Sequence, residues 1–486
     1  MVERRARMSD SMNYKLFIDG AWRSGGHGAD LPLLNPAIEQ EFGRVAIASA
    51  SDLDDALTSA QAGLLQWSNT PAEERGTLLV RAARILAGKI DIAAASLSAE
   101  QGKTLAEAKG EYARAVEMLE WNGTHAAKTS APYSIDEKRI IVPEPIGVVA
   151  AFTPWNYPSV LNARKLGASI AAGCSVILKA AEETPSAGVY MIEALEEAGI
   201  PPGVVSLVFG HPPMISEHLL ASPVVRALSF TGSTPVGKQL AKMAAENLQR
   251  CVLELGGHSP VVVFEDADLA KAAWAISEYK FECAGQSCNA PSRILVARSI
   301  YREFLSQLVR AAEKIRVGAP DDPETDMGPM ANARRIEAME RLTKDAVKRG
   351  AKVEIGGERL DRPGFYWAPT ILTNVHPDSQ VLHEEPFGPI LTVAPFDTVE
   401  GAIEEANRSE YGLAAYFFTG SPAIQEKMIR SLTAGAVSMN HLKGVSADAP
   451  NAGVKQSGYG YEGGLEGVRA FQNLKLVNGV KAVSVA

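Results

Sequence analysis

Long apolar runs are absent from this chain of 486 residues. No stretch approaches the roughly eighteen uninterrupted apolar residues of a membrane-spanning helix, so we expect no membrane span. The N-terminal MVERRARMSDSMNYKLFIDG is basic but lacks the apolar core of a secretory signal. We expect residues 1–12 to be disordered and the protein to be cytoplasmic.

Basic charge is scarce as well. Lys and Arg number 48 against 57 Asp and Glu, and the net charge is −9. An acidic balance argues against nucleic acid as the main partner, because phosphate binding requires clustered Lys and Arg. The composition, 46% apolar and 22% charged, is ordinary for a globular protein, and the length suits two or three domains.

Cysteine is the third scarce residue, with only four in the chain: Cys174, Cys251, Cys283 and Cys288. They show no CxxC spacing and no nearby His pair, so we predict no metal site. A structural disulfide is not expected in a reducing compartment. The pair in FECAGQSCNAPSR, residues 281–293, therefore consists of buried inert thiols or includes a reactive nucleophile.

The pattern along the chain predicts an α/β protein. Short extended pieces occupy residues 15–47, and Thr70-Pro71-Ala72-Glu73 reads as a capping box that opens a helix. A further helix is predicted for AEAKGEYARAVEMLEWNG. Strands then alternate with helices from about residue 139 to 250, and again from about 261 to 440. Such alternation predicts parallel sheets covered by helices.

Two segments are typical of nucleotide-binding sites. SFTGSTPVGK, 229–238, passes from a strand through a turn at Gly232 into a helix, whose first N–H groups can face a phosphate. A plain strand–turn–helix fits equally well. SVILKAAEETP, 175–185, ends a strand with Lys179 and Glu182, which can bind ribose hydroxyls or can be two solvated charges.

Two other segments carry residues suited to catalysis. LELGGHSP, 253–260, places Glu254 before two glycines that allow close backbone approach to a ligand. This carboxyl group can act as a general base or can cap a helix. In AFTPWNYP, 151–158, the amide of Asn156 can donate to an oxyanion or can belong to an ordinary turn.

Taken in order, the motifs TPWNYP, KAAEETP, FTGSTPVG, LELGG, AGQSC, EEPFGP and KQSGYG resemble those of the aldehyde dehydrogenase superfamily of NAD(P)-dependent enzymes. The resemblance covers residues 16–480 and is nearest to the succinate-semialdehyde dehydrogenase-like group. It implies a Rossmann-like cofactor domain, an α/β catalytic domain and a small β oligomerisation flap. The expected boundaries are 13–124 with 146–255 for the NAD-binding domain, 256–441 for the catalytic domain, and 125–145 with 466–486 for the flap.

The resemblance assigns the chemistry residue by residue. Cys288 matches the family's nucleophile, whose thiolate attacks an aldehyde to give a thiohemiacetal and then a thioester. Asn156 and the N–H of Cys288 match the oxyanion hole, and Glu254 matches the base that activates the hydrolytic water. Lys165 and Glu462 match positions that support catalysis, in part as a proton path. Cys283 has no family role and is predicted to be a bystander.

The implied cofactor is NAD, because the Glu182 carboxylate would repel the 2′-phosphate of NADP. An oligomer, dimer or tetramer, is expected through pairing of the flap strands. The residues predicted to bind the cofactor are Thr153, Pro154, Trp155, Lys179, Glu182, Gly232, Ser233, Val236, Leu255, Gly256, Glu385 and Phe387.

The substrate residues expected from the resemblance are Arg164, Glu282, Tyr157 and His441. In one hypothesis Arg164 binds the far carboxylate of a short ω-semialdehyde such as succinate semialdehyde, while Glu282 points away. In the other, Arg164 and Glu282 neutralise each other, and the site takes a polar neutral, zwitterionic or aromatic aldehyde. A CoA-acylating enzyme is disfavoured by Glu254, and a non-catalytic protein by the complete set of Cys288, Glu254 and Asn156.

Overall fold

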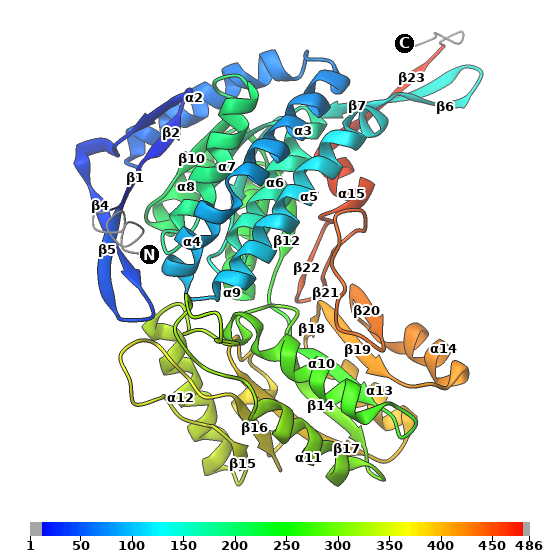
Figure 1. The fold of residues 1–486 in the computed structure, drawn as a ribbon. Coiled ribbons are helices and arrows are strands. Elements are labelled where there is room, and N and C mark those ends of the chain that lie inside the picture. Colours follow the sequence, from blue (N-terminus) through cyan, green and yellow to red (C-terminus); the bar gives the residue numbers. More distant parts are fainter. Residues whose placement is uncertain (1–11, 480–486) are drawn as a thin grey trace.

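The computed structural model describes residues 12–479. Two large sheets, each covered by helices, form two lobes that lie one above the other in Figure 1. The alternation of strands and helices confirms the predicted α/β class. The segment 1–12 that was predicted to be disordered lies outside the described residues except for Met12, and so do residues 480–486 of the predicted flap.

The first sheet positions half of the site. Its order is β22-β12-β11-β8-β9-β10-β2-β3, and the five strands from β12 to β10 are parallel. The strands β8, β9 and β10 lie side by side in chain order, and β11 then pairs with the other edge of β8. The strand order therefore reverses between β8 and β11. At such a reversal the carboxyl ends of the strands leave a crevice for a ligand. The strands are β2 (Leu16–Ile18), β3 (Ala21–Arg23), β8 (Val148–Phe152), β9 (Ser175–Lys179), β10 (Val205–Val208), β11 (Val225–Thr231), β12 (Arg250–Glu254) and β22 (Gly458–Tyr459).

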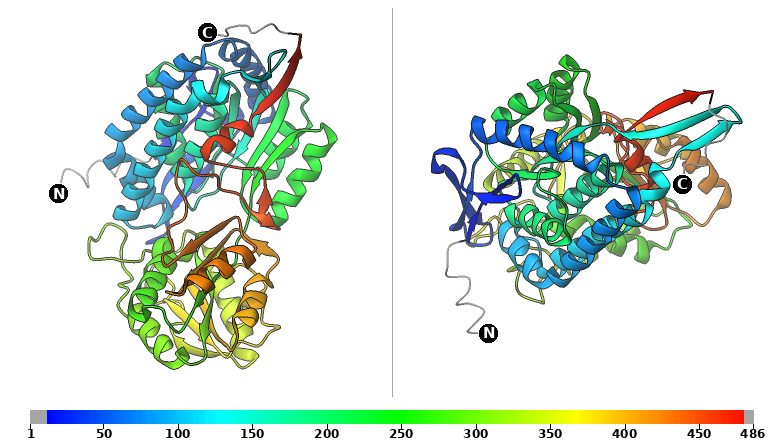
Figure 2. Two further views of the ribbon diagram at one scale, coloured as in Figure 1. Left: turned by 90° about the vertical axis from the view of Figure 1, so that its right-hand side faces the viewer. Right: turned by 90° about the horizontal axis from the view of Figure 1, so that it is seen from above.

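Helices cover both faces of this sheet (Figures 1 and 2). In α6 and α7 a proline stands at the first position, and Gly173 and Gly199 end the helices with φ of 93° and 95°. These are the start and stop signals that only proline and glycine provide at low cost. The helices are α2 (Ala50–Trp67), α3 (Ala72–Gly88), α4 (Ile90–Gln101), α5 (Leu105–Ser130), α6 (Pro158–Ala172), α7 (Pro185–Ala198), α8 (Pro212–Ala221) and α9 (Thr234–Glu246). None of the helices in the described part of the chain is long and apolar enough to cross a bilayer.

Two local predictions for these helices are wrong. Thr70 does not cap α3, because Pro71 takes the N-cap position and the Thr70 hydroxyl turns back to donate to the Gln66 carbonyl (3.2 Å). A capping box exists instead at α5, where Thr104 and Glu107 satisfy each other's backbone N–H groups. Helix α5 also continues to Ser130, so its last turns occupy residues 125–130 that were predicted to start the flap.

The second sheet supplies the other half of the site. Its order is β15-β16-β17-β14-β13-β19-β20, and all neighbours except β15 and β16 are parallel. The strands are β13 (Ser259–Val263), β14 (Pro291–Ala297), β15 (Lys352–Ile355), β16 (Thr370–Thr373), β17 (Ile390–Phe396), β19 (Ala414–Phe418) and β20 (Ala436–Met439). Its helices are α10 (Leu269–Phe281), α11 (Tyr301–Ala312), α12 (Ala333–Lys348), α13 (Val399–Asn407) and α14 (Pro422–Ser431).

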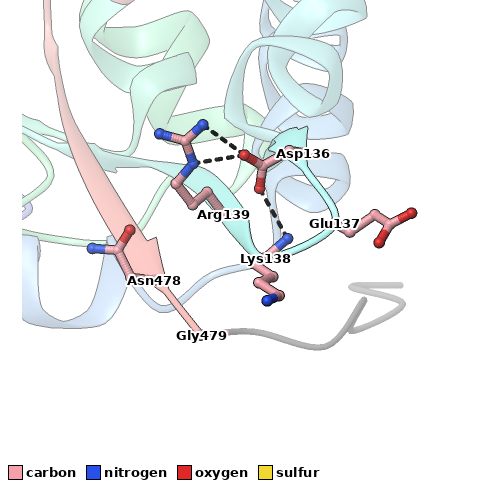
Figure 3. Close-up of a pocket in the computed structure, with 6 residues that line it drawn as sticks. All are labelled: Asp136, Glu137, Lys138, Arg139, Asn478 and Gly479. Atoms are coloured by element: carbon pink, nitrogen blue, oxygen red, sulfur yellow. Dashed lines mark hydrogen bonds and ion pairs between the residues drawn. The ribbon is translucent and has the colours of Figure 1, made fainter.

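A third, three-stranded sheet projects from the body of the molecule, as Figure 1 and the right view of Figure 2 show. It joins a hairpin to the C-terminal strand in the order β23-β7-β6. Its turn is closed by Asp136, which accepts from the Lys138 N–H (2.9 Å) and the Arg139 guanidinium (2.7 Å) (Figure 3). These strands are β6 (Tyr133–Asp136), β7 (Arg139–Pro145) and β23 (Gln472–Asn478), and the remaining small elements are β1 (Met12–Tyr14), β4 (Asp30–Asn35), β5 (Gln40–Ala46), β18 (Tyr411–Gly412), β21 (Val454–Lys455) and α15 (Gly464–Arg469).

Candidate active site

A cavity of about 710 Å³ lies between the two large sheets. Its walls come from the residues that follow β8, β11 and β12 in the first sheet and from those that precede β14 and β17 in the second. The strand reversal beside β8 therefore faces the start of the second sheet. Of the predicted site residues, those that line this cavity are Pro154, Trp155, Asn156, Tyr157, Arg164, Gly232, Ser233, Glu254, Leu255, Gly256, Glu282, Cys288, Glu385, Phe387 and Glu462.

Several predicted residues do not line the cavity. Thr153 is buried behind the wall and donates its hydroxyl to Asn162 Oδ1 (2.7 Å). Val236 is exposed on the outer side of α9, and His441 is exposed in the loop after β20, where Lys443 lines the cavity instead. The other three, Lys165, Lys179 and Glu182, form ion pairs outside the cavity wall.

A tight turn places Cys288 at the cavity. The 3-10 segment η2 (Glu282–Gly285) holds Cys283, Ala284 and Gly285 in the left-handed region, with φ of 52°, 51° and 70°. A side chain on Gly285 would collide with the Gly388 carbonyl at 2.3 Å, so glycine is required there. The Gln286 side chain fixes the turn, since it donates to the Cys283 carbonyl (2.9 Å) and accepts from the Ala331 N–H (3.0 Å).

The two thiols of this segment differ in access. Cys288 is half-buried and lines the cavity, whereas Cys283 is only 1% exposed. Burial raises the pKa of Cys288 to about 12, the charges of Glu385 and Glu254 add to the shift, and Arg164 opposes it. Cys283 accepts a hydrogen bond from the Gln101 amide (3.2 Å). Both cysteines are free thiols.

Asn156 stands at the start of α6, next to the Cys288 turn. Its Nδ2 donates one hydrogen to the Gln286 carbonyl (2.9 Å), which leaves its second amide hydrogen for another acceptor. The backbone carbonyl of Asn156 accepts from the buried ammonium of Lys103 (2.6 Å), which also pairs with Glu111 (2.5 Å). The amide is thus oriented by one hydrogen bond, and its Oδ1 has no partner among the described residues.

Glu254 is the last residue of β12 and is buried in the cavity wall. Desolvation raises the pKa of its carboxyl to about 8, with a further rise from Glu462, while Arg164 and Lys165 oppose the shift. Asn451 Nδ2 donates to Glu254 Oε2 (3.0 Å), and Oε1 has no partner among the described residues. The carboxyl group therefore has one oxygen held by Asn451 and one buried oxygen without a partner.

Lys165 and Glu462 form a buried ion pair behind this carboxyl. The Lys165 ammonium donates to Glu462 Oε1 (2.5 Å) and to the Ser229 hydroxyl (3.1 Å). The second oxygen of Glu462 has no partner within residues 12–479, and Glu462 itself lines the cavity. The pair thus extends from the cavity, which Glu462 lines, to the Ser229 hydroxyl in β11.

Arg164 and Glu282 do not neutralise each other. Glu282 accepts from the Tyr157 hydroxyl (3.2 Å) and lies 3.9 Å from the Arg114 guanidinium. Arg164 is 4% exposed, and its Nε and Nη2 have no hydrogen-bond partner in the described part of the chain. The hypothesis of an Arg164–Glu282 pair is not supported, because Glu282 contacts Tyr157 and Arg114 instead. Arg164 lines the cavity, and two of its guanidinium nitrogens are buried without a partner among the described residues.

The opposite end of the cavity, together with Lys179 and Glu182 beyond its wall, suits a dinucleotide. Ser233 and the first residues of α9 line it, so the N–H groups of a 13-residue helix face that space. Lys179 and Glu182 pair at the carboxyl end of β9 (2.6 Å), and Glu182 also accepts from the Gly210 N–H (3.1 Å). These donors and acceptors fit a pyrophosphate and a ribose.

Glu385 and Phe387 lie between this end of the cavity and Cys288. Glu385 is held by the Gly257 N–H (3.1 Å), and burial raises the pKa of its carboxyl to about 7. Phe387 meets Trp155 edge to face, with ring centroids 5.6 Å apart. A carboxylate for the second ribose and a flat apolar wall for a ring are thus present together.

Sequence reasoning missed some wall residues. Asn451 comes from the loop before β21, Arg335 from α12 and Tyr279 from α10. None belongs to a recognised motif, and only the packing of the two lobes brings them to the cavity. No group of three or more His, Cys, Asp or Glu residues suited to a metal ion occurs in the described ranges.

Comparison with known proteins agrees with this geometry. Residues 22–477 match the family described as "Aldehyde dehydrogenase family". A 4-(hydroxymethyl)benzenesulfonate dehydrogenase of Comamonas testosteroni is 44% identical over 96% of this chain and 98% of its own length. A 3-sulfolactaldehyde dehydrogenase of Pseudomonas putida is 37% identical over 96% and 97%. The structure of a succinate-semialdehyde dehydrogenase from Burkholderia pseudomallei superposes with a TM-score of 0.94 at 36% identity, covering 96% of this chain and 98% of that one.

Proposed function

The chain belongs to the aldehyde dehydrogenase family of NAD(P)-dependent oxidoreductases, and from that premise we propose that it oxidises an aldehyde with an anionic group at its far end. The product is the carboxylic acid, and the cofactor is NAD. The observation that carries this proposal is the unpartnered, buried guanidinium of Arg164 in the cavity that Cys288 lines. A cation buried in this way is costly unless an anion reaches it.

Cys288 acts as the nucleophile. Its thiolate attacks the aldehyde carbon, and the carbonyl oxygen takes the free amide hydrogen of Asn156. The Arg164 charge favours the thiolate against the burial that raises its pKa. NAD held by Ser233, Lys179 and Glu182 would supply the acceptor for the hydride of the attacked carbon, and Cys288 would then hold the substrate as a thioester.

Glu254 then serves as the base for hydrolysis. Its unpartnered Oε1 removes a proton from water, and the resulting hydroxide attacks the thioester. The proton passes toward the Glu462–Lys165 pair, which lies behind Glu254. Water is the natural acyl acceptor with this base in place, which disfavours the CoA-acylating alternative.

NAD is preferred to NADP because of Glu182. The carboxylate lies at the end of β9 with Lys179 as its partner. A 2′-phosphate beside it would meet a like charge worth about 1 to 4 kcal/mol at 4 Å in a solvated site.

Relatives support an anionic substrate. Their names give a benzenesulfonate, a sulfolactaldehyde and succinate semialdehyde, and each carries an acidic group. Carboxylate and sulfonate oxygens both accept the two parallel N–H bonds that a guanidinium offers. Tyr157 and Tyr279 also line the cavity, so an aromatic spacer between aldehyde and anion fits as well as a short chain.

Two matched pairs of aldehydes test this proposal. We expect kcat/KM with NAD to be at least roughly tenfold higher for succinate semialdehyde than for butanal, and for 4-formylbenzenesulfonate than for benzaldehyde, since a charged hydrogen bond adds about 1.5 to 3 kcal/mol. The larger of the two preferences identifies the carboxylate or the sulfonate as the natural group. Equal rates within both pairs would contradict the anionic-substrate proposal.

Assembly and location complete the proposal. The flap exposes apolar side chains on β6 and β23, among them Ile135 (52% exposed) and Leu474 (59%), and we propose that these strands pair in a dimer or tetramer. The four free thiols fit the proposed cytoplasmic location. Light scattering of the unmodified protein and of Ile135→Asp measures the molar mass in solution. We expect the substitution to weaken the assembly and so to lower this mass.

A further inference from the structure

Asn451 contacts the Glu254 carboxyl group through its side chain and the Glu462 backbone through its own backbone. It lies in the loop between β20 and β21 and is half-buried in the cavity wall. Its backbone pairs with Glu462 in both directions, by N–H to carbonyl contacts of 2.6 and 2.9 Å. Its side-chain Nδ2 donates to Glu254 Oε2 (3.0 Å). One residue thus fixes the distance between Glu254 and the segment that carries Glu462.

We propose that Asn451 is a positioning residue for hydrolysis, which holds Oε2 of Glu254 so that Oε1 is presented to the attacking water. This inference rests on the proposed role of Glu254 as the base. The two oxygens of Glu254 support it, since Oε2 is held by the amide and Oε1 has no partner among residues 12–479. Without the amide, the carboxyl group loses its side-chain donor and keeps only the backbone N–H of Gly453, so we expect its orientation to be less well fixed.

The amide also favours the ionised carboxylate, because a neutral N–H donor stabilises the charged form. Charged groups act on Glu254 from several elements. Glu462 repels it from the loop before α15, while Arg164 and Lys165 attract it from α6. Cys288 lies on the far side of the cavity, where the Glu254 charge raises the pKa of its thiol. The uncharged donors to Glu254 are the Asn451 amide and the backbone N–H of Gly453, which also lowers the pKa of the carboxyl group.

The local fold allows the side chain to be tested separately. Asn451 is bound to Glu462 through backbone groups only, so a substitution of the side chain leaves those two bonds in place. Asn451→Leu removes the donor at similar volume, and Asn451→Gln keeps an amide donor with one more methylene. Asp448→Asn changes an exposed residue of the same loop and serves as the control.

The experiment compares NADH formation in rapid mixing with the steady rate that follows, from pH 6 to 10. For Asn451→Leu we expect the initial burst to persist, while the apparent pKa of the steady rate rises by about one unit, which is a roughly tenfold loss at pH 7. At high pH the rate recovers. Asn451→Gln restores part of the loss, and Asp448→Asn follows the unmodified enzyme. Steady hydrolysis of 4-nitrophenyl acetate, which acylates a thiol without NAD, is expected to show the same shift.

Two results would overturn the inference. One is an Asn451→Leu profile that superposes on that of the unmodified enzyme. The other is an equal loss of burst and steady rate at every pH, which marks a purely structural role. The proposed function is tested apart by Glu254→Gln, which keeps the burst and loses the steady rate if Glu254 is the base. Undiminished turnover of Glu254→Gln would refute the base itself, whatever Asn451→Leu shows.

Discussion

Replacing Arg164 with leucine tests the anion site most sharply. The guanidinium is 4% exposed, with two N–H groups that have no partner in the described chain. A substrate anion that satisfies them makes charge-assisted hydrogen bonds worth about 1.5 to 3 kcal/mol. Arg164→Leu should therefore lower the ratio of kcat/KM for succinate semialdehyde to that for butanal by roughly 10- to 150-fold.

The ratio is the correct readout because Arg164 has a second effect. Its charge opposes the rise in the pKa of Cys288 and of Glu254. The loss of that charge should therefore slow the oxidation of both aldehydes by the same factor, and this factor cancels in the ratio of their kcat/KM values. The assay measures NADH formation at 340 nm over a range of each aldehyde. Arg114→Leu is the control, since Arg114 lines the same cavity but is only half-buried, and its guanidinium lies 3.9 Å from Glu282. An ion pair near the surface contributes about 0.2 to 1 kcal/mol. Arg114→Leu should therefore change the ratio of kcat/KM for the two aldehydes by less than about fivefold.

Stability gives an independent check on the same variant. A buried cation without a partner costs free energy in the folded state, so Arg164→Leu should raise the free energy of unfolding by on the order of 1 to 4 kcal/mol. Urea denaturation followed by circular dichroism measures this. A folded Arg164→Leu enzyme with an unchanged substrate ratio would refute the reasoning, because the anion would then bind elsewhere.

Three further predictions follow from other contacts. Glu182→Ser should raise the preference for NADP over NAD by at least roughly tenfold, measured as a ratio of kcat/KM values, because the repelling charge is gone; an unchanged ratio would contradict this. Cys283→Ser should keep turnover within about twofold, since a hydroxyl can replace the buried thiol toward Gln101; loss of turnover in a folded variant would give Cys283 a role. Glu100 is fully buried, and its pKa is raised to about 8 by desolvation. Between pH 4.5 and 8 its carboxyl group ionises only in the unfolded chain, so the free energy of unfolding falls as pH rises. Glu100→Gln should therefore raise the free energy of unfolding by on the order of 4 kcal/mol at pH 8 but by little at pH 4. Equal gains at both pH values would exclude this cause.

The sequence predicts the fold well where signals are local. Strands such as β8 and β9 are short runs of β-branched residues, and proline and glycine mark the ends of α6 and α7. The position of Asn156 and Glu254 at strand ends follows from the same reasoning. The prediction that Thr70 caps α3 was wrong because Pro71 occupies the N-cap position. The predicted end of α5 was too early because the sequence has no stop signal before Ser130.

Contacts between segments that lie far apart in the chain could not be predicted from the sequence. Arg164 and Glu282 are 118 positions apart in the chain, and only the folded structure shows that Tyr157 takes the Glu282 carboxylate. Asn451 approaches Glu254 because a loop after β20 returns to the first sheet, which no pattern of residue types encodes. Opposite charges in a sequence predict attraction, but the nearest partner in space decides which pair forms.

The central claim is that Cys288 carries the acyl group that Glu254-activated water removes. The most direct measurement mixes Glu254→Gln enzyme with NAD and succinate semialdehyde, quenches in acid, and determines the mass of each cysteine-containing peptide. The account predicts one succinyl group on Cys288, none on fragment ions that contain Cys283 but not Cys288, and one NADH per site. NADH formation without an adduct on Cys288, or an adduct on another residue, would contradict it.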